Sequence, residues 1–190
     1  MRLKLAKFVS AFSHPVVLFP VSVPFFMSRA DLSSEKFLHF LPILLILAIP
    51  IIYFFYALKK KKISDWELTK RQERYPLYIL SLVCGALGLF FLRIYGSQAL
   101  FTLALIFYLL GIFITLINFF WKISTHTAGI TAGALAFNLL FNQTIYHYLY
   151  LLIPLVIWSR YEEKKHTLSQ LLGGVFLGVS VVVLVLILHG

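Results

Sequence analysis

A serine–arginine pair followed by a histidine stands in the last polar segment of the chain, residues 158–170. Five residues separate Ser159-Arg160 from His166, and Gln170 follows after three more. An arginine guanidinium binds phosphate oxygens through paired hydrogen bonds, and an imidazole can attack phosphorus as a nucleophile. The segment directly precedes an apolar run, so this chemistry would lie at the end of a hydrophobic helix. The pattern indicates a site that binds and attacks a phosphate.

Two earlier polar segments, residues 63–76 and 121–127, hold residue types suited to the same chemistry. Together with residues 158–170, they are the first, second and third polar segments. Their candidate substrate-binding and catalytic residues are Lys70, Arg71, Arg74, Lys122, Ser124 and His126. Taken alone, a basic loop beside a membrane is typical of headgroup binding, and a histidine at a helix start is often structural. The prediction of a site therefore depends on the three segments acting together.

The composition predicts an all-α integral membrane protein that forms one domain. The 190 residues are 61% hydrophobic and 13% charged, whereas a soluble domain carries about twice that charged fraction. The apolar residues come in long blocks, which favours a bundle of about six or seven membrane-spanning helices. We expect these helices at residues 8–27, 37–58, 77–92, 99–120, 127–141, 145–158 and 167–188. The first run contains His14-Pro15 and two further prolines, so it spans in a kinked form, lies at the interface or is cleaved.

The order of the helices predicts that the three polar segments share one side of the membrane. Two predicted helices separate each polar segment from the next, and an even number of crossings returns the chain to the same side. Of the 17 lysines and arginines, only Arg29, Lys36 and Arg93 fall in segments that this order places on the other side of the membrane. The positive-inside rule then places the polar segments on the cytoplasmic side of a membrane, with a prokaryotic cytoplasmic membrane as the expected location.

The formal net charge of +10 does not indicate a nucleic-acid partner. Basic residues between membrane helices set orientation and contact anionic headgroups, so we expect membrane lipids as the partners instead. The one cysteine, Cys84, lies within an apolar run and has no second cysteine to pair with. No spacing of metal ligands is present, and no cofactor is expected.

The ordered pattern of the three polar segments resembles the type 2 phosphatidic acid phosphatase (PAP2) superfamily. That superfamily carries Lys-x6-Arg-Pro, then Pro-Ser-Gly-His, then Ser-Arg-x5-His-x3-Asp. The corresponding residues here are Arg74-Tyr75-Pro76, then Ile123-Ser124-Thr125-His126, then Ser159-Arg160-x5-His166-x3-Gln170. The resemblance covers about residues 65–180 and implies a PAP2-like helical bundle.

The resemblance implies a metal-independent phosphatase that acts on a lipid phosphate. It makes His166 the nucleophile that becomes a transient phosphohistidine, and His126 the acid that protonates the leaving group. It makes Arg74 and Arg160 the phosphate ligands, with Ser124 and nearby backbone N–H groups as further donors. Phosphatidic acid, phosphatidylglycerophosphate and polyprenyl phosphates or diphosphates all fit as substrates.

Two positions depart from the PAP2 pattern. Gln170 stands where the superfamily has an aspartate that orients the nucleophilic histidine. At i+4 from His166, Gln170 is expected on the same helical face, where its amide oxygen can accept a hydrogen bond from the imidazole. Glu67 stands at the position of a phosphate-binding lysine, so Lys70, Arg71 or Lys122 would have to supply the charge. Asp65 or Glu67 would then take over the orienting role.

These departures leave two interpretations open. The chain is either a divergent active phosphatase or a catalytically decayed, PAP2-like protein that binds lipid phosphates or serves as a scaffold. A small transporter is disfavoured because ionisable residues are confined to the ends of the predicted helices. The glycine pairs Gly129-x3-Gly133 and Gly174-x3-Gly178 predict close packing of the two helices that carry His126 and His166.

Overall fold

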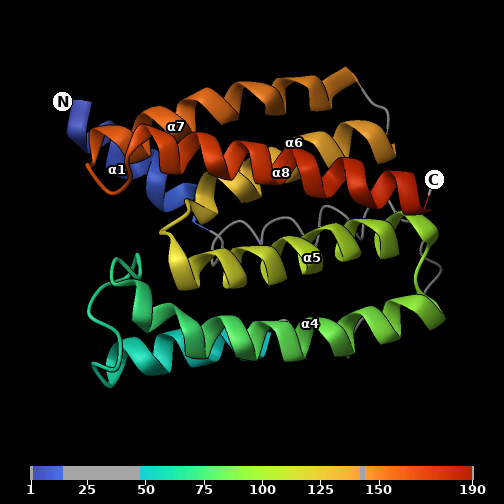
Figure 1. The fold of residues 1–190 in the computed structure, drawn as a ribbon, viewed down its shortest axis with the longest axis horizontal. Helices are drawn as coiled ribbons and strands as arrows, with labels where there is room; N and C mark the ends of the chain where they lie inside the picture. The colour runs from blue at the N-terminus through green and yellow to red at the C-terminus, as the bar shows by residue number, and fades with distance from the viewer. Residues whose placement is uncertain (1, 15–47, 142–143, 190) are drawn as a thin grey trace. The chain divides into compact units, whose positions relative to one another are not determined.

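The computed structural model describes residues 2–14, 48–141 and 144–189. These residues form helices and connecting turns and include no strand (Figure 1), so the predicted all-α class is confirmed for them. The described chain divides into two compact units. The first comprises Met1–Pro20 and Leu116–Gly190, and the second comprises Val21–Thr115. The prediction of a single domain stays a prediction.

The second unit contains the helix Ala48–Lys59, a short 3-10 helix η1 (Arg71–Arg74), α4 (Tyr75–Tyr95) and most of α5 (Gln98–Phe120). Pro76 occupies the first turn of α4, where its missing N–H is tolerated because first-turn N–H groups have no partner within the helix. At the other end of α4, the Gly96 N–H donates to the Leu92 carbonyl at 2.8 Å and closes the helix. Both boundaries lie within three residues of the predicted helix 77–92.

The first unit contains α1 (Arg2–Phe12), α6 (Thr125–Phe141), η2 (Thr144–Leu151), α7 (Leu152–Glu162) and α8 (Leu168–His189). The 3-10 helix η2 changes to α-helix shortly before Pro154, which therefore sits in the first turn of α7. The Asn138 side chain is buried and joins α6 to η2, because its amide donates to the carbonyls of Ala134 and Tyr146, each at 2.8 Å.

The helices α6 and α8 run side by side in the same direction (Figure 1) and form the closest packing in the first unit. A Cβ atom added at Gly174 would contact the Thr127 hydroxyl and would lie 2.7 Å from the Ser124 carbonyl oxygen. One added at Gly178 would lie 2.8 Å from the carbonyl oxygen of Ala128. The α8 part of the predicted close packing is thus confirmed. On α6 the contact surface differs from the prediction, since a Cβ at Gly129 would meet nothing within 4 Å.

Three helices of the described residues are long and apolar enough to cross a membrane: residues Arg71–Tyr95, Gln98–Phe120 and Leu168–Leu188. They correspond to the predicted helices 77–92, 99–120 and 167–188. The predicted helix 127–141 is α6, and the predicted helix 145–158 is divided between η2 and α7. Most of the predicted run 8–27 and the first part of 37–58 lie outside the described residues.

Candidate functional site

The third polar segment covers the C-terminal end of α7, which ends at Glu162, and the tight turn that follows. The Lys164 N–H donates to the Tyr161 carbonyl at 2.9 Å, and the Lys165 N–H donates to the Arg160 carbonyl at 3.3 Å. This pair of bonds is a Schellman motif, in which the residue after the helix cap adopts the left-handed conformation. Lys164 does so with φ of 54°, where glycine is the usual residue. This turn connects the end of α7, which carries Arg160, to His166.

His166 lies in this turn and is buried, with 6% of its surface exposed. It precedes α8, which begins at Leu168. The prediction that His166 and Gln170 share a face of one helix is therefore wrong. Instead, the Gln170 side-chain oxygen accepts from the Thr167 N–H at 3.1 Å, and the Gln170 N–H approaches the Thr167 hydroxyl at 3.4 Å. This reciprocal pair is a capping box at the start of α8.

The second polar segment starts α6 in a similar way. Ser124 is fully buried, and its hydroxyl accepts from the Thr127 N–H at 3.4 Å as an N-cap. The Thr127 hydroxyl donates to the Leu171 carbonyl at 3.0 Å, which joins the first turns of α6 and α8. The Lys122 ammonium donates to the Lys165 carbonyl at 3.0 Å. These contacts fix the second polar segment against the third.

The arrangement concentrates positive potential at one end of the first unit. The N-terminal ends of α6 and α8 lie together there, and a helix N-terminus carries a partial positive charge from its aligned peptide dipoles. His126 is in the first turn of α6 and is 3% exposed, and the Arg160 side chain is buried beside the same end. An anion is the ligand that such an end favours.

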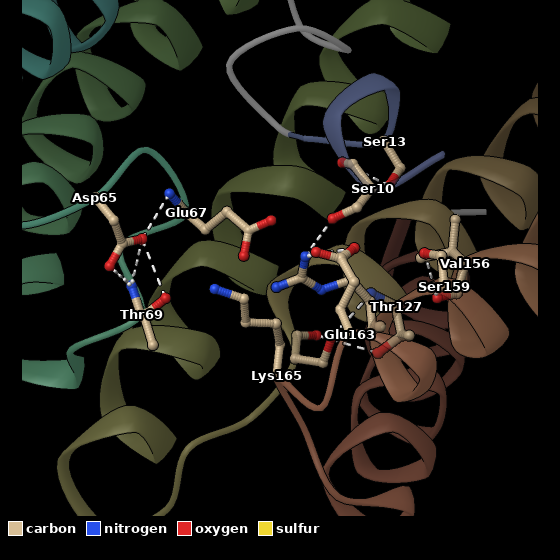
Figure 2. Close-up of polar contacts among 12 residues, drawn as sticks. Ser10, Ser13, Asp65, Glu67, Thr69, Thr127, Val156, Ser159, Glu163 and Lys165 are labelled. Carbon is tan, nitrogen blue, oxygen red and sulfur yellow. Dashed lines mark hydrogen bonds and ion pairs between the residues drawn. The ribbon is translucent and has the colours of Figure 1, made fainter. Parts of the chain in front are cut away.

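Arg160 does not stand alone in this cluster. Its Nη1 lies 3.7 Å from Oε1 of Glu163, and both side chains are almost fully buried. The same nitrogen donates to the hydroxyl of Ser10, which comes from α1 (Figure 2). Sequence reasoning missed Glu163, although its i,i+3 spacing from Arg160 would have predicted the pair on a helix.

The end of α1 also reaches His126. The rings of His14 and His126 are in edge-to-face contact, with centroids 5.3 Å apart and planes at 72°. His14 follows the C-terminal end of α1, because the helix ends at Phe12 and a turn follows at Ser13. Nothing in the spacing of the chain indicated its contact with His126, since 112 positions separate the two (126 − 14).

The first polar segment belongs to the second unit and is organised by its own carboxylates. Asp65 accepts from the N–H of Glu67 at 2.9 Å and from the N–H and hydroxyl of Thr69 (Figure 2), which folds the loop on itself. Asp65 thus organises this loop, and the orienting of a histidine by Asp65 or Glu67 stays a prediction. Glu73 accepts from the N–H of Ser64 at 2.7 Å and from its hydroxyl at 2.9 Å.

The basic residues of this loop differ in burial. Arg74 is 4% exposed, and its Nε donates to the Leu68 carbonyl at 2.8 Å. Leu68 supplies that carbonyl from a left-handed conformation with φ of 52°. Lys70 is exposed and pairs with Glu73 at 3.5 Å, and Arg71 is half-buried. The predicted contribution of Lys70, Arg71 and Arg74 to the site stays a prediction.

The structure thus brings together six of the predicted residues at one end of the first unit: Lys122, Ser124, His126, Arg160, His166 and Gln170. It adds Ser10, His14 and Glu163. Among the described residues, no group of three or more His, Cys, Asp or Glu side chains is arranged to hold a metal ion. These side chains include a guanidinium, a group that binds anions, and imidazoles, which can act as nucleophiles and proton donors.

No family model, curated protein sequence or solved structure matches this chain. The resemblance to the PAP2 superfamily therefore rests on the three sequence motifs alone. Within the described residues the protein is all-helical and carries long apolar helices. A buried cluster of histidine and arginine lies at the start of α6 and α8.

Proposed function

We propose that this chain is a membrane phosphatase that removes a phosphate from a lipid phosphate or diphosphate through a phosphohistidine intermediate. The observation that carries the proposal is the burial of His126, Arg160 and His166 in one unit, where the N-terminal ends of α6 and α8 lie together. Burial of three polar side chains is costly unless they serve one another or a ligand. The two helix ends favour an anion as that ligand.

In the proposed reaction, His166 attacks phosphorus while Arg160 and the helix N-termini stabilise the charge on the phosphoryl oxygens. The new N–P bond forms as the bond from phosphorus to the lipid oxygen breaks. His126 donates a proton to that oxygen and becomes a base. It then takes a proton from water, which attacks the phosphohistidine, releases inorganic phosphate and restores His166.

The lipid character of the substrate is inferred from the apolar helices. The helix α8 is long and apolar enough to cross a membrane and begins at the site, so an apolar tail can lie against α8 while the headgroup enters the site. We propose a PAP2-like bundle of about six or seven spanning helices, with the site on the cytoplasmic side of the membrane.

The test is phosphate release by the purified protein in detergent. Phosphatidic acid, phosphatidylglycerophosphate and undecaprenyl phosphate and diphosphate would be supplied in turn. His166→Ala should lower the rate on the best substrate by about a thousandfold or more, because it removes the nucleophile. His147→Ala is the matched control, since His147 is exposed on η2 and pairs with the Thr144 carbonyl. Absence of release from every substrate, or equal release by His166→Ala, would overturn the proposal.

The second candidate is a lipid-phosphate-binding protein or scaffold that has lost catalysis. Two observations favour it: Gln170 is used as a helix cap, and the charge of Arg160 is balanced by the buried Glu163. This candidate predicts saturable binding of vesicles that contain phosphatidic acid, without phosphate release. His166→Ala would then leave vesicle binding within about twofold of the original protein, because a nucleophile contributes little to ground-state binding.

A further inference from the structure

The C-terminal end of α1 is built into the polar cluster. Ala6 and Ser10 face the interior and are at most 1% exposed, while Phe8 and Phe12 are exposed. Ser13 and His14, which follow the helix, are each 5% exposed. The Ser13 hydroxyl donates to the Ser10 carbonyl at 3.1 Å and closes the last turn (Figure 2). A polar helix end is thus buried against α7.

Ser10 touches the guanidinium that the proposed function assigns to phosphate binding. Its hydroxyl accepts from Nη1 of Arg160, and Glu163 approaches that same nitrogen. A guanidinium has five N–H donors in a rigid plane. The hydrogen bond to Ser10 and the ion pair with Glu163 both hold Nη1, and because the guanidinium is rigid they fix the orientation of its plane. Ser10 therefore determines how Arg160 presents its donors.

His14 touches the imidazole that the proposed function assigns to proton transfer. The edge-to-face contact of the two rings, at 5.3 Å between centroids, restricts rotation of the His126 ring about its side-chain torsion. Proton transfer requires the donor nitrogen to lie within hydrogen-bond reach of the leaving oxygen. A ring held in one orientation meets that requirement more often than a ring free to rotate.

We propose that α1 completes the site, with Ser10 and His14 as positioning residues for Arg160 and His126. The two contacts involve different residues of the helix end and different residues of the cluster. This inference rests on the proposed function for its catalytic consequence, and on the contacts alone for its structural consequence. The C-terminal end of α1 and the turn after it are then part of the phosphate site.

The catalytic test separates substrate binding from turnover. Ser10→Ala should raise KM about tenfold with kcat nearly unchanged, because a misoriented Arg160 weakens phosphate binding. His14→Ala should lower kcat about ten- to a hundredfold with KM nearly unchanged, because His126 is misplaced. Ser10→Thr keeps the hydroxyl and His14→Phe keeps the ring, so each should recover most of the loss. Phe8→Ala, exposed on the same helix, is the matched control for both.

A second measurement keeps the inference independent of catalysis. Histidine labelled with carbon-13 gives one ring resonance per imidazole, and His126→Gln identifies that of His126. His14→Ala should displace the His126 resonance and Phe8→Ala should not, because the His14 ring lies beside it. If no lipid phosphate is hydrolysed but the displacement occurs, the proposed function fails and the positioning contact stands. An unmoved His126 resonance, or unchanged kcat and KM in an active protein, would overturn the role of α1.

Discussion

Two ion pairs with the same i,i+3 spacing lie in different regions of this molecule. Arg160 and Glu163 pair in the third polar segment at 3.7 Å, with side chains 2% and 4% exposed. Lys70 and Glu73 pair in the first polar segment at 3.5 Å, with side chains 70% and 17% exposed. Both pairs occur beside a helix end in segments that the sequence assigned to phosphate binding. Spacing does not distinguish them, but burial does.

The difference decides what each pair can do. A buried guanidinium keeps its charge only with close partners, so Arg160 is held by Glu163 and Ser10 in one geometry. An exposed ammonium is hydrated and screened, so Lys70 gains little from Glu73 and samples many rotamers. The third polar segment therefore has the fixed geometry that a catalytic site needs, whereas Lys70 belongs to a loop that folds on its own carboxylates.

The first prediction concerns two substitutions, each of which removes the cation from one of these ion pairs. Arg160→Met should lower the free energy of unfolding by about 3–5 kcal/mol, because it leaves the Glu163 carboxylate buried without its cation. Lys70→Met should change it by about 0–1 kcal/mol. Thermal unfolding in one detergent measures both. Equal losses of stability in the two variants would remove the distinction between the regions.

A double variant sharpens this comparison. Arg160→Met combined with Glu163→Leu removes both buried charges, so it should recover most of the stability lost by Arg160→Met alone. Under the proposed function it should still release no phosphate, because the guanidinium is absent. Recovery of activity together with stability would show that Arg160 supports the fold and not the substrate.

The second prediction concerns substitutions that disturb the packing of α6 against α8, next to the third polar segment. Gly174→Ala and Gly178→Ala place a methyl group against the backbone of α6, and each should lower stability by about 1–3 kcal/mol. Gly129→Ala is the control within the same pair of helices. Its Cβ meets nothing within 4 Å, and alanine favours a helix over glycine by about 1 kcal/mol. A loss of stability in Gly129→Ala as large as that in Gly174→Ala would contradict the described contact surface.

Much of the fold was predictable because local features determine it. The apolar runs gave the positions of α4, α5, α6 and α8 to within a few residues. Pro76 accounts for the start of α4, and Ser124 for the start of α6. The change from 3-10 to α-helix near Leu152 was not predicted, because a continuous apolar run does not distinguish the two helix types.

The site was predictable only in part. The motifs placed His126, Arg160 and His166 correctly at helix ends, but the partners Ser10 and His14 are far away in the sequence and follow only from the packing of α1 on α7. The place of His166 before α8 depends on a left-handed Lys164. That conformation is unusual for a lysine, so it could not be predicted from the residue type.

The third prediction concerns Gln170, the residue whose role the structure changes most. Gln170→Ala should lower stability by about 1 kcal/mol, since it removes the acceptor for the Thr167 N–H at the start of α8. Gln170→Glu keeps an acceptor there and adds a negative charge at a helix N-terminus, so stability should be kept or rise by about 0.3–1 kcal/mol. Leu172→Ala, at an exposed position one turn further along α8, is the control.

Kinetics decide whether the helix cap is the whole role of Gln170. If its oxygen only caps α8, Gln170→Ala should keep kcat within about twofold of the original protein, because the His166 side chain loses no partner. If its oxygen orients the nucleophile, kcat should fall by orders of magnitude, as for other groups that hold a catalytic imidazole. The first outcome would place Gln170 with Asp65, a side chain that organises its own segment, and would leave the chemistry to the buried cluster around Arg160.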